Sequence, residues 1–473
     1  MPTNKTECCF MFECIKENRK CNERTVKSIA LFLVLSSYFI TAIDGSIVIT
    51  GLKRIAEDLQ LSSVSLSWVQ NAYVLVFGGF MLLGGRLGDT LGRKRMFNLS
   101  LMLFGFGSLG AGVAPSAGIM IAARFVQGVG AAVMAPAALA LIMDYFEGEK
   151  RTKAVAWYGS ISGIGLCFGL IIGGAVTTYL TWRDGFLINV PIVGVMLFLS
   201  VKYLLNADLT KHRFDIIGTL LSVAGVFCVI YAIDGASAVA LWLVSGIVLL
   251  TLLVHAEQKA PMPIMPLSLF HSRTRRNAYV ARALLIAALM GYNFFISEFM
   301  QDAFHFTPLL TGLAFLPMTI TTFLGAVEVP QLVHKYGNKK ILYVGLSLVL
   351  LGFFLLLSLT VGKSYLYGIA FPILFIGIGQ GLAMSPLTNL GIEDVDKRDS
   401  GAASGLVNAS HQIGGALGLS LMTAASNGVV DAGMRCHIGM AVALVCIILA
   451  LGISAFPSMR YLYTLKAGGS KHR

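Results

Sequence analysis

The 473-residue chain is strongly apolar: 56% of its residues are hydrophobic, 13% are charged, and the mean hydropathy is +0.77. A soluble chain carries about 25% charged residues, so this composition leaves no room for a separate soluble domain. The net charge of +12 does not indicate nucleic-acid binding, because the basic residues lie in short loops between apolar stretches, where they set topology and attract anionic lipid headgroups.

The chain begins with a polar segment, residues 1–27, that contains four cysteines without Cys-x-x-Cys spacing: Cys8, Cys9, Cys14 and Cys21. We expect a reduced cytoplasmic tail of little order, with a metal or redox role as the alternative. The first apolar stretch, 28–50, is too long for the core of a cleavable signal peptide and is interpreted as a membrane span.

Apolar stretches of about 20 residues, long enough to cross a bilayer core of about 30 Å, recur along nearly the whole chain. Fourteen spans are predicted, at residues 28–50, 66–85, 96–114, 118–141, 154–177, 186–205, 215–234, 238–256, 278–300, 309–329, 340–360, 365–389, 401–425 and 437–457. They indicate an all-α polytopic membrane protein with two pseudo-symmetric six-helix bundles. The predicted units are an N-terminal bundle (28–205), two extra central transmembrane helices with linkers (206–277), a C-terminal bundle (278–457) and a C-terminal tail (458–473).

The distribution of basic residues orients these spans. With the N-terminus inside, the inner segments carry 28 Lys and Arg and the outer segments carry five. By the positive-inside rule, we expect a multi-pass protein of the cell (plasma) membrane with both termini cytoplasmic.

Two charged residues are predicted deep inside spans, where a charge costs about 2.5–3.5 kcal/mol and therefore needs a partner or a task. Asp44 lies six residues before the outer end of the first span, and Arg124 lies six residues into the fourth. Both are roughly 9 Å deep at 1.5 Å per residue. We expect them to be close neighbours, because they share this depth. A proton-coupling role is the functional interpretation, since burial and a nearby arginine change a carboxylate's proton affinity in opposite directions; a structural ion pair is the alternative.

Other polar residues give weaker signals. Glu298, near the outer end of the ninth span, is a candidate second proton site or an exposed interfacial residue. Arg282 is expected to snorkel to the inner interface. Pocket-lining candidates are Trp68, Asn71, Tyr73, Tyr292 and Asn293, each of which could instead pack or face lipid.

The loop between the second and third spans carries the most specific motif, Gly85-Arg86-Leu87-Gly88-Asp89-Thr90-Leu91-Gly92-Arg93-Lys94. Its glycines permit a tight turn between closely spaced helices. A similar pattern, a polar residue followed by Gly337 and Lys339-Lys340, follows the tenth span. This faint repeat suits alternating access by two halves, although two short basic loops can also match by chance.

The loop resembles the signature of the major facilitator superfamily. Arg124-Phe125-Val126-Gln127-Gly128 and the stretch from Trp182-Arg183 to Asn189-Val190-Pro191 resemble further signatures, the latter one of fourteen-span drug:proton antiporters. The resemblance covers residues 28 to 457. It implies that Gly85, Asp89, Gly92, Arg93 and Lys94 form a cytoplasmic gating loop, with Asp89 meeting the start of the thirteenth span near Asp399-Ser400-Gly401.

The fifth span departs from the antiporter pattern. Gly169-Leu170-Ile171-Ile172-Gly173-Gly174 keeps the glycines but has Leu170 where these exporters carry proline. The glycine face, which comprises Gly165, Gly169, Gly173 and Gly174, is predicted to pack closely against a neighbouring helix.

Together these features predict a secondary active transporter that exports small amphipathic compounds in exchange for protons, as a monomer in the lipid bilayer. A nutrient or metabolite importer or uniporter, favoured by Leu170, and a non-transporting membrane sensor are the alternatives. No nucleotide-binding or metalloprotease motif is present in the sequence, so we predict neither an enzyme nor a cofactor or metal.

Overall fold

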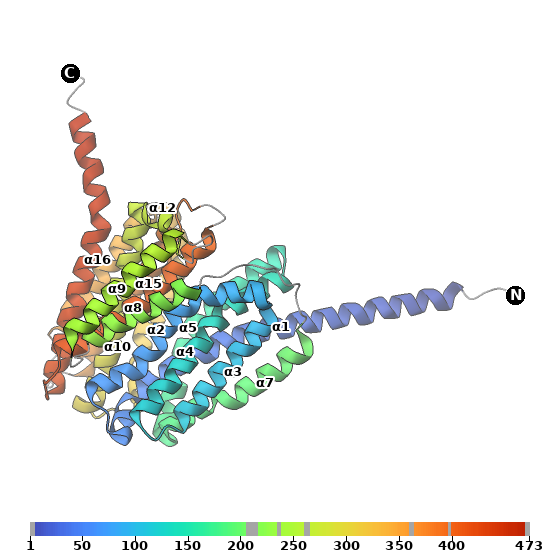
Figure 1. Ribbon diagram of the computed structural model, residues 1–473, viewed down its shortest axis with the longest axis horizontal. Coiled ribbons are helices and arrows are strands. Elements are labelled where there is room, and N and C mark those ends of the chain that lie inside the picture. Colours follow the sequence, from blue (N-terminus) through green and yellow to red (C-terminus); the bar gives the residue numbers. More distant parts are fainter. Residues whose placement is uncertain are drawn as a thin grey trace.

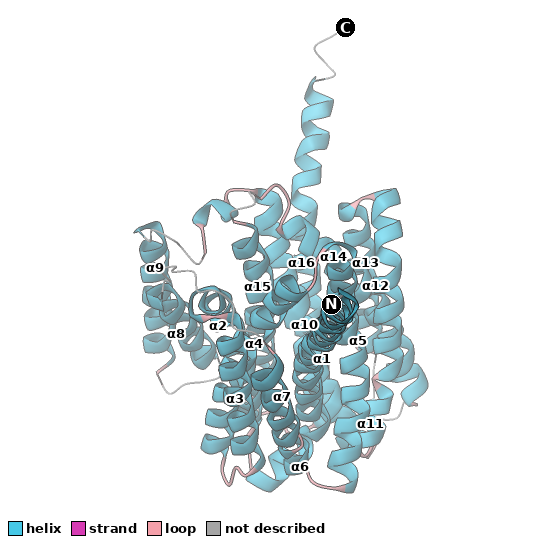
Figure 2. Cartoon of the chain, turned by 90° about the vertical axis from the view of Figure 1, so that its right-hand side faces the viewer, coloured by secondary structure: helices cyan, strands magenta, loops and turns pink. Residues whose placement is uncertain are grey.

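The computed structural model describes residues 5–204, 216–233, 238–259, 265–358, 364–395 and 399–468. The described residues form helices joined by short loops and contain no strand (Figures 1 and 2). Side chains are described from residue 25 to residue 455, except for some within α2, α5 and the start of α15.

The first seven helices pack mainly against one another and are called the N-terminal helix group. They are α1 (Lys5–Leu59), α2 (Ser63–Leu91), α3 (Arg93–Gly112), α4 (Ala117–Tyr145), α5 (Gly148–Tyr179), α6 (Trp182–Leu187) and α7 (Asn189–Tyr203).

A second set of helices, called the C-terminal helix group, also packs mainly within itself. Its members are α10 (Arg273–Ala303), α11 (Pro308–Ala314), α12 (Leu316–Tyr336), α13 (Asn338–Leu356), η2 (Leu366–Ala370), α14 (Phe371–Gly391), α15 (Ser400–Ala425) and α16 (Ala432–Gly468). Between the groups in sequence, α8 (Ile216–Ile233) packs on α9 (Val239–Lys259), and α8 also contacts α2 and α15 (Figure 2). The short helix η1 (Leu267–Phe270) precedes α10.

Each predicted apolar stretch overlaps at least one described helix. Among the described residues, ten helical segments are long and apolar enough to cross a membrane, and two shorter apolar helices, Phe168–Tyr179 and Ile217–Ile233, accompany them. The chain is therefore an all-helical, multi-pass membrane protein.

Two predicted spans are interrupted near a proline. The 186–205 stretch divides at Ile188 into α6 and α7, and the 309–329 stretch divides at Phe315 into α11 and α12. Pro191 and Pro317 each follow the break within a few residues, and a proline cannot donate the backbone hydrogen bond that would continue the preceding turn.

The segment predicted as an N-terminal tail is helical from Lys5 and continues directly into the first apolar stretch, extending away from the helix groups (Figure 1). The chain has no glycine or proline between Pro2 and Gly45, so nothing in this segment breaks the helix. The side chains of the four tail cysteines lie outside the described residues.

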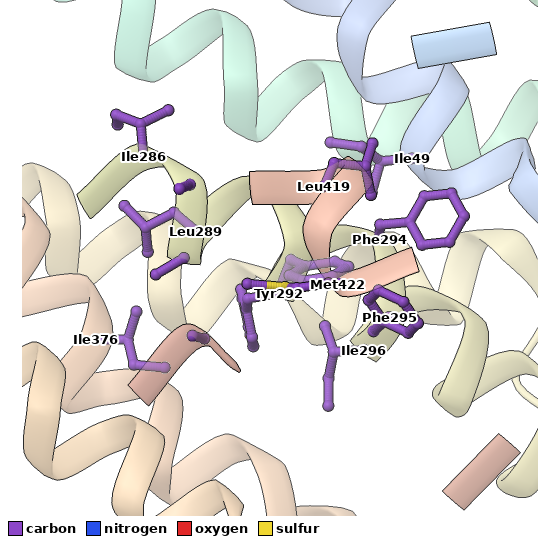
Figure 3. Packing of buried hydrophobic residues seen from close by; sticks show 14 of the residues in the cluster. Ile49, Ile286, Leu289, Tyr292, Phe294, Phe295, Ile296, Ile376, Leu419 and Met422 are labelled. Carbon is purple, nitrogen blue, oxygen red and sulfur yellow. The ribbon is translucent and has the colours of Figure 1, made fainter. Parts of the chain in front are cut away.

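Helix α10 lies at the centre of the largest apolar cluster. Tyr292, Phe294 and Phe295 of α10 are buried there, with Met422 of α15 beside Tyr292 (Figure 3). Because this packing fixes α10 against α15 and α16, its polar side chains are held at defined positions.

The end of the molecule with the loops that contain Arg93 and Lys339 is called the basic end. The other end, which contains Lys53 and Asp302, is called the opposite end. The two helix groups are in contact near the opposite end, where Ser297 Oγ donates to the carbonyl of Ile49 at 2.7 Å. Lys53 Nζ lies 2.5 Å from Asp302 Oδ1.

Further hydrogen bonds link the groups towards the middle of the molecule. Asn71 Nδ2 donates to Ser420 Oγ at 2.7 Å, and Gln70 Nε2 contacts the Met290 sulfur at 2.8 Å. The hydrogen bonds and the ion pair described between the two groups thus lie at the opposite end and towards the middle of the molecule. The assembly is thus closed at the opposite end.

Candidate functional site

The two buried charges predicted from the sequence form an ion pair inside the N-terminal helix group. Arg124 Nη1 on α4 lies 2.5 Å from Asp44 Oδ2 on α1. The side chain of Asp44 is 0% exposed and that of Arg124 is 1% exposed. The predicted proximity is confirmed, whereas the proton-coupling role of the pair remains a prediction.

Amide and hydroxyl groups surround the carboxylate. Asp44 Oδ1 accepts hydrogen bonds from Gln127 Nε2 at 2.7 Å and from Asn189 Nδ2 at 3.3 Å. Both amides also donate to Ser108 Oγ, at 2.8 and 3.0 Å. Side chains from α1, α3, α4 and α7 therefore converge on one buried negative charge, as the cost of burying such a charge requires.

The arginine is held by further contacts. Its Nε donates to the Val69 carbonyl of α2 at 3.1 Å, and its Nη1 also donates to Gln127 Oε1 at 2.6 Å. The guanidinium carbon lies 4.3 Å from the centroid of the Tyr73 ring and 5.7 Å from that of Phe186. These rings exclude water from the pair and stabilise the cation through their π faces.

Glycines on two helices let the backbones approach closely enough for this network. A Cβ added at Gly107 of α3 would lie 2.6 Å from the Gln127 backbone nitrogen, and one added at Gly128 of α4 would lie 2.6 Å from the Tyr73 carbonyl oxygen. Larger side chains at these positions would push α3 and α2 away from α4.

Three members of the network were not predicted as site residues. Gln127 and Asn189 belong to motifs visible in the sequence, and Gln127 lies one helical turn from Arg124, so that spacing could have identified it. Ser108 gives no comparable signal, because an isolated serine in an apolar helix is common.

The glycine face of α5 packs as predicted against a neighbouring helix, and at one position against the other helix group. Added Cβ atoms at Gly165, Gly169 and Gly173 would meet α1, at 2.8 Å from Ala42 Cβ in the first case. Gly174 instead faces α11, where its added Cβ would lie 2.7 Å from the Pro308 carbonyl oxygen. This face therefore packs both against α1, which carries Asp44, and against the other helix group.

The predicted gating loop is a tight connection between α2 and α3. Gly92 has a φ of 96°, which favours glycine, and Gly337 between α12 and α13 has a φ of 83°. The two loops thus share a glycine with positive φ. A chance similarity of two short basic sequences would not require this shared backbone conformation.

The basic residues of the loop hold neighbouring helices. Arg93 pairs with Asp144 of α4, and Lys94 Nζ donates to the carbonyl of Leu204 at 2.5 Å. The surroundings of Gly85 and the side chain of Asp89 lie outside the described residues, and so does the predicted meeting of Asp89 with the start of α15.

Glu298 is paired rather than exposed. Its two carboxylate oxygens lie 2.5 and 2.6 Å from Arg435 Nη2 of α16, and its side chain is 17% exposed. Both residues belong to the C-terminal helix group, so Glu298 is separate from the Asp44 network.

The pocket-lining candidates occupy several environments. Trp68 packs against Phe227 and Tyr231 of α8, and Asn71 bonds to α15. Tyr73 covers Arg124.

The remaining two candidates lie on α10. Tyr292 is fully buried between Phe315 and Phe353, and Asn293 is half-buried. In this conformation Tyr292 faces the interior of the C-terminal helix group.

The prediction that Arg282 snorkels to the interface is wrong. Its side chain is buried and bonds to α14, with Nη1 2.7 Å from Thr388 Oγ1. Neighbouring helices surround it before it can extend to the interface, which the spacing along α10 alone does not show.

Known proteins resemble this chain along most of its length. It is 34% identical over 419 residues to the puromycin resistance protein pur8 of Streptomyces alboniger, covering 86% of this chain and 83% of that protein. It is also 34% identical over 406 residues to the cephamycin export protein CmcT of Amycolatopsis lactamdurans, covering 83% and 84%.

Among solved structures, the fold resembles the POT family transporter PepTSo, with a TM-score of 0.68 at 14% identity, covering 91% of this chain and 98% of that one. A family profile, the Major Facilitator Superfamily, matches residues 34–419. This match covers most of the chain and includes the Asp44–Arg124 pair and the glycine loop, and the chain therefore belongs to the Major Facilitator Superfamily of membrane transporters.

Proposed function

We propose that this transporter exports small amphipathic compounds from the cell in exchange for protons, by alternating access. The observation that carries the proposal is the buried Asp44–Arg124 pair with its amide partners, a titratable group in the membrane with defined donors. Intramembrane carboxylates of this kind are typical of proton relays in pumps and transporters. The names of the relatives support the direction, since one is a resistance protein and another an export protein.

The proposed topology has fourteen spans, formed by two six-helix bundles and the α8–α9 pair, with both termini in the cytoplasm of a plasma-membrane protein. The excess of basic residues on one side supports this orientation. The basic end is then cytoplasmic, and the contacts at the opposite end correspond to an inward-facing conformation.

In the proposed cycle, the outward-facing protein takes up a proton at Asp44. It then closes on the outer side and opens to the cytoplasm. Substrate binding and proton release then occur on the inner side. Protonation weakens the attraction between Asp44 and Arg124, so the pair provides two electrostatic states that α1 and α4 can respond to. The gating loop containing Asp89, Arg93 and Lys94 would close the cytoplasmic side in the other half of the cycle.

Leu170 supports an importer as a second candidate, because these exporters carry proline at that position. The residue is buried, and its backbone faces Gly312 of α11 across the two groups. The close packing at this position does not itself need a proline, so we retain export as the main proposal.

The test uses inverted membrane vesicles that contain the full chain and are energised to an acidic interior. Export by antiport predicts dye uptake coupled to proton release from the vesicles, and Asp44→Asn is predicted to abolish both while the protein remains folded in the membrane. A symporter would move dye and protons in the same direction, and a sensor would move neither.

A further inference from the structure

A second buried cation lies in the C-terminal helix group without a carboxylate partner among the described residues. Arg282 of α10 is 7% exposed. Its Nη1 donates to the Met384 carbonyl at 3.3 Å and to Thr388 Oγ1 at 2.7 Å, both on α14, and its Nε is buried without an acceptor. Arg124, at similar burial, has Asp44 as counter-charge. Burial of a guanidinium without an anion is unfavourable, so Arg282 lacks the negatively charged group that would stabilise it.

A further buried polar side chain lies near this guanidinium. His411 of α15 is within electrostatic range of Arg282, and its Nδ1 is buried without a hydrogen-bond partner. Arg282 and His411 are called the Arg282 cluster.

The Arg282 cluster faces the other helix group. Tyr38 of α1 is within electrostatic range of Arg282, and its ring centroid lies 4.8 Å from that of Tyr158 on α5. Arg282 is nine residues from the start of α10, about 14 Å from the basic end. Ser297, which helps close the opposite end, lies four turns further along α10. The cluster therefore lies between the groups, on the side of the closure that is towards the basic end.

We infer that the Arg282 cluster binds an anionic group, such as a carboxylate, sulfonate or phosphate, on the transported compound. This inference rests on the proposed export function and names a substrate class for it. Nη1 is engaged by α14, whereas Nε has no acceptor and can donate to an oxyanion, and a guanidinium edge matches two oxygens of such a group. Tyr38 and Tyr158 provide an aromatic surface for the apolar part of the compound.

The inference is tested with two dyes that differ only in the anionic group, rhodamine B and its ethyl ester. Binding to the purified full chain is measured by fluorescence anisotropy in a neutral detergent. We expect Arg282→Gln to weaken binding of the free acid by about tenfold to a hundredfold, because a charge-assisted hydrogen bond is lost, and to change binding of the ester less than about twofold. Arg276→Gln, on the exposed surface of the same helix, removes the same charge and is expected to change neither.

Two further variants keep the test decisive if Arg282→Gln does not fold. Arg282→Lys retains the charge but loses the two-pronged geometry, and His411→Gln removes the imidazole. Each is expected to weaken binding of the acid and not of the ester. Equal loss of both dyes in a folded variant, or no loss of the acid, would overturn the inference and leave Arg282 as a link between α10 and α14.

The source of the anionic group and the export function are tested separately. Loss of acid binding when phosphatidylglycerol is added would assign the cluster to a lipid headgroup and overturn the inference. Arg282-dependent binding without dye transport in energised vesicles would refute the export proposal and retain the anion site. Transport of both dyes that does not depend on Arg282 would refute the anion site and retain the export proposal.

Discussion

Replacing Asp44 with asparagine isolates the charge of the buried pair, because the two side chains have nearly the same volume and no cavity forms. Three donors converge on the carboxylate, from Arg124 at 2.5 Å, Gln127 at 2.7 Å and Asn189 at 3.3 Å. An asparagine offers one acceptor and one NH₂ group, so at least one of these donors must face another donor, and Arg124 loses its counter-charge.

Breaking a buried pair from one side costs about 3–5 kcal/mol. We therefore expect Asp44→Asn to lower the free energy of unfolding by this amount, which a protein in the upper part of the usual range of about 5–15 kcal/mol survives in the folded state. Arg124→Gln alone should have a comparable effect, because it leaves the carboxylate buried without its cation.

The double variant Asp44→Asn with Arg124→Gln removes both charges and should be more stable than the sum of the single losses implies, by about 0.5–3 kcal/mol. The assay is unfolding in mixed micelles with increasing sodium dodecyl sulfate, followed by tryptophan fluorescence. Strict additivity of the two losses would refute the reasoning that the pair is coupled in the folded protein.

Three further predictions concern the contacts around the site. Gly174→Val should prevent α5 from packing against α11, because an added Cβ would lie 2.7 Å from the Pro308 carbonyl oxygen, and should therefore increase labelling of Ser297→Cys by a membrane-impermeant maleimide. The control is Gly173→Val, whose side chain meets α1 instead. Unchanged labelling in Gly174→Val would count against the closure. Lys53→Met removes the ion pair with Asp302 and should lower the free energy of unfolding by only about 0.2–1 kcal/mol, because both side chains are 33% exposed. The charge swap Lys53→Asp with Asp302→Lys should restore the midpoint of unfolding. No recovery would mean that the pair does not stabilise this state. If Glu298 carries a second proton, Glu298→Gln should halve the number of protons released per dye transported, and an unchanged ratio would leave Glu298 as the structural partner of Arg435.

Much of the helical architecture can be predicted from the sequence, because spans of about 20 apolar residues are a direct consequence of bilayer thickness. The breaks at Ile188 and Phe315 also have a visible cause in Pro191 and Pro317, although their positions could not be given to the residue. The continuation of α1 back to Lys5 was not foreseen, because a polar composition was interpreted as a tail although no helix-breaking residue is present.

The site was predictable only in part. Asp44 and Arg124 could be paired by depth, since both lie the same number of residues from one end of their spans. Ser108 and the burial of Arg282 depend on which helix faces which, and rotation about a helix axis is weakly encoded where nearly every side chain is apolar.

The central claim, that substrate binding on the inner side displaces a proton from Asp44, is tested most directly by measuring proton release from purified protein. Rhodamine dye is added to the full chain in weakly buffered detergent solution, and a pH indicator records the change. The wild-type protein should release protons as the dye binds, and Asp44→Asn should bind dye without releasing them. Equal release from both proteins, or dye binding to the wild type without release, would contradict the account.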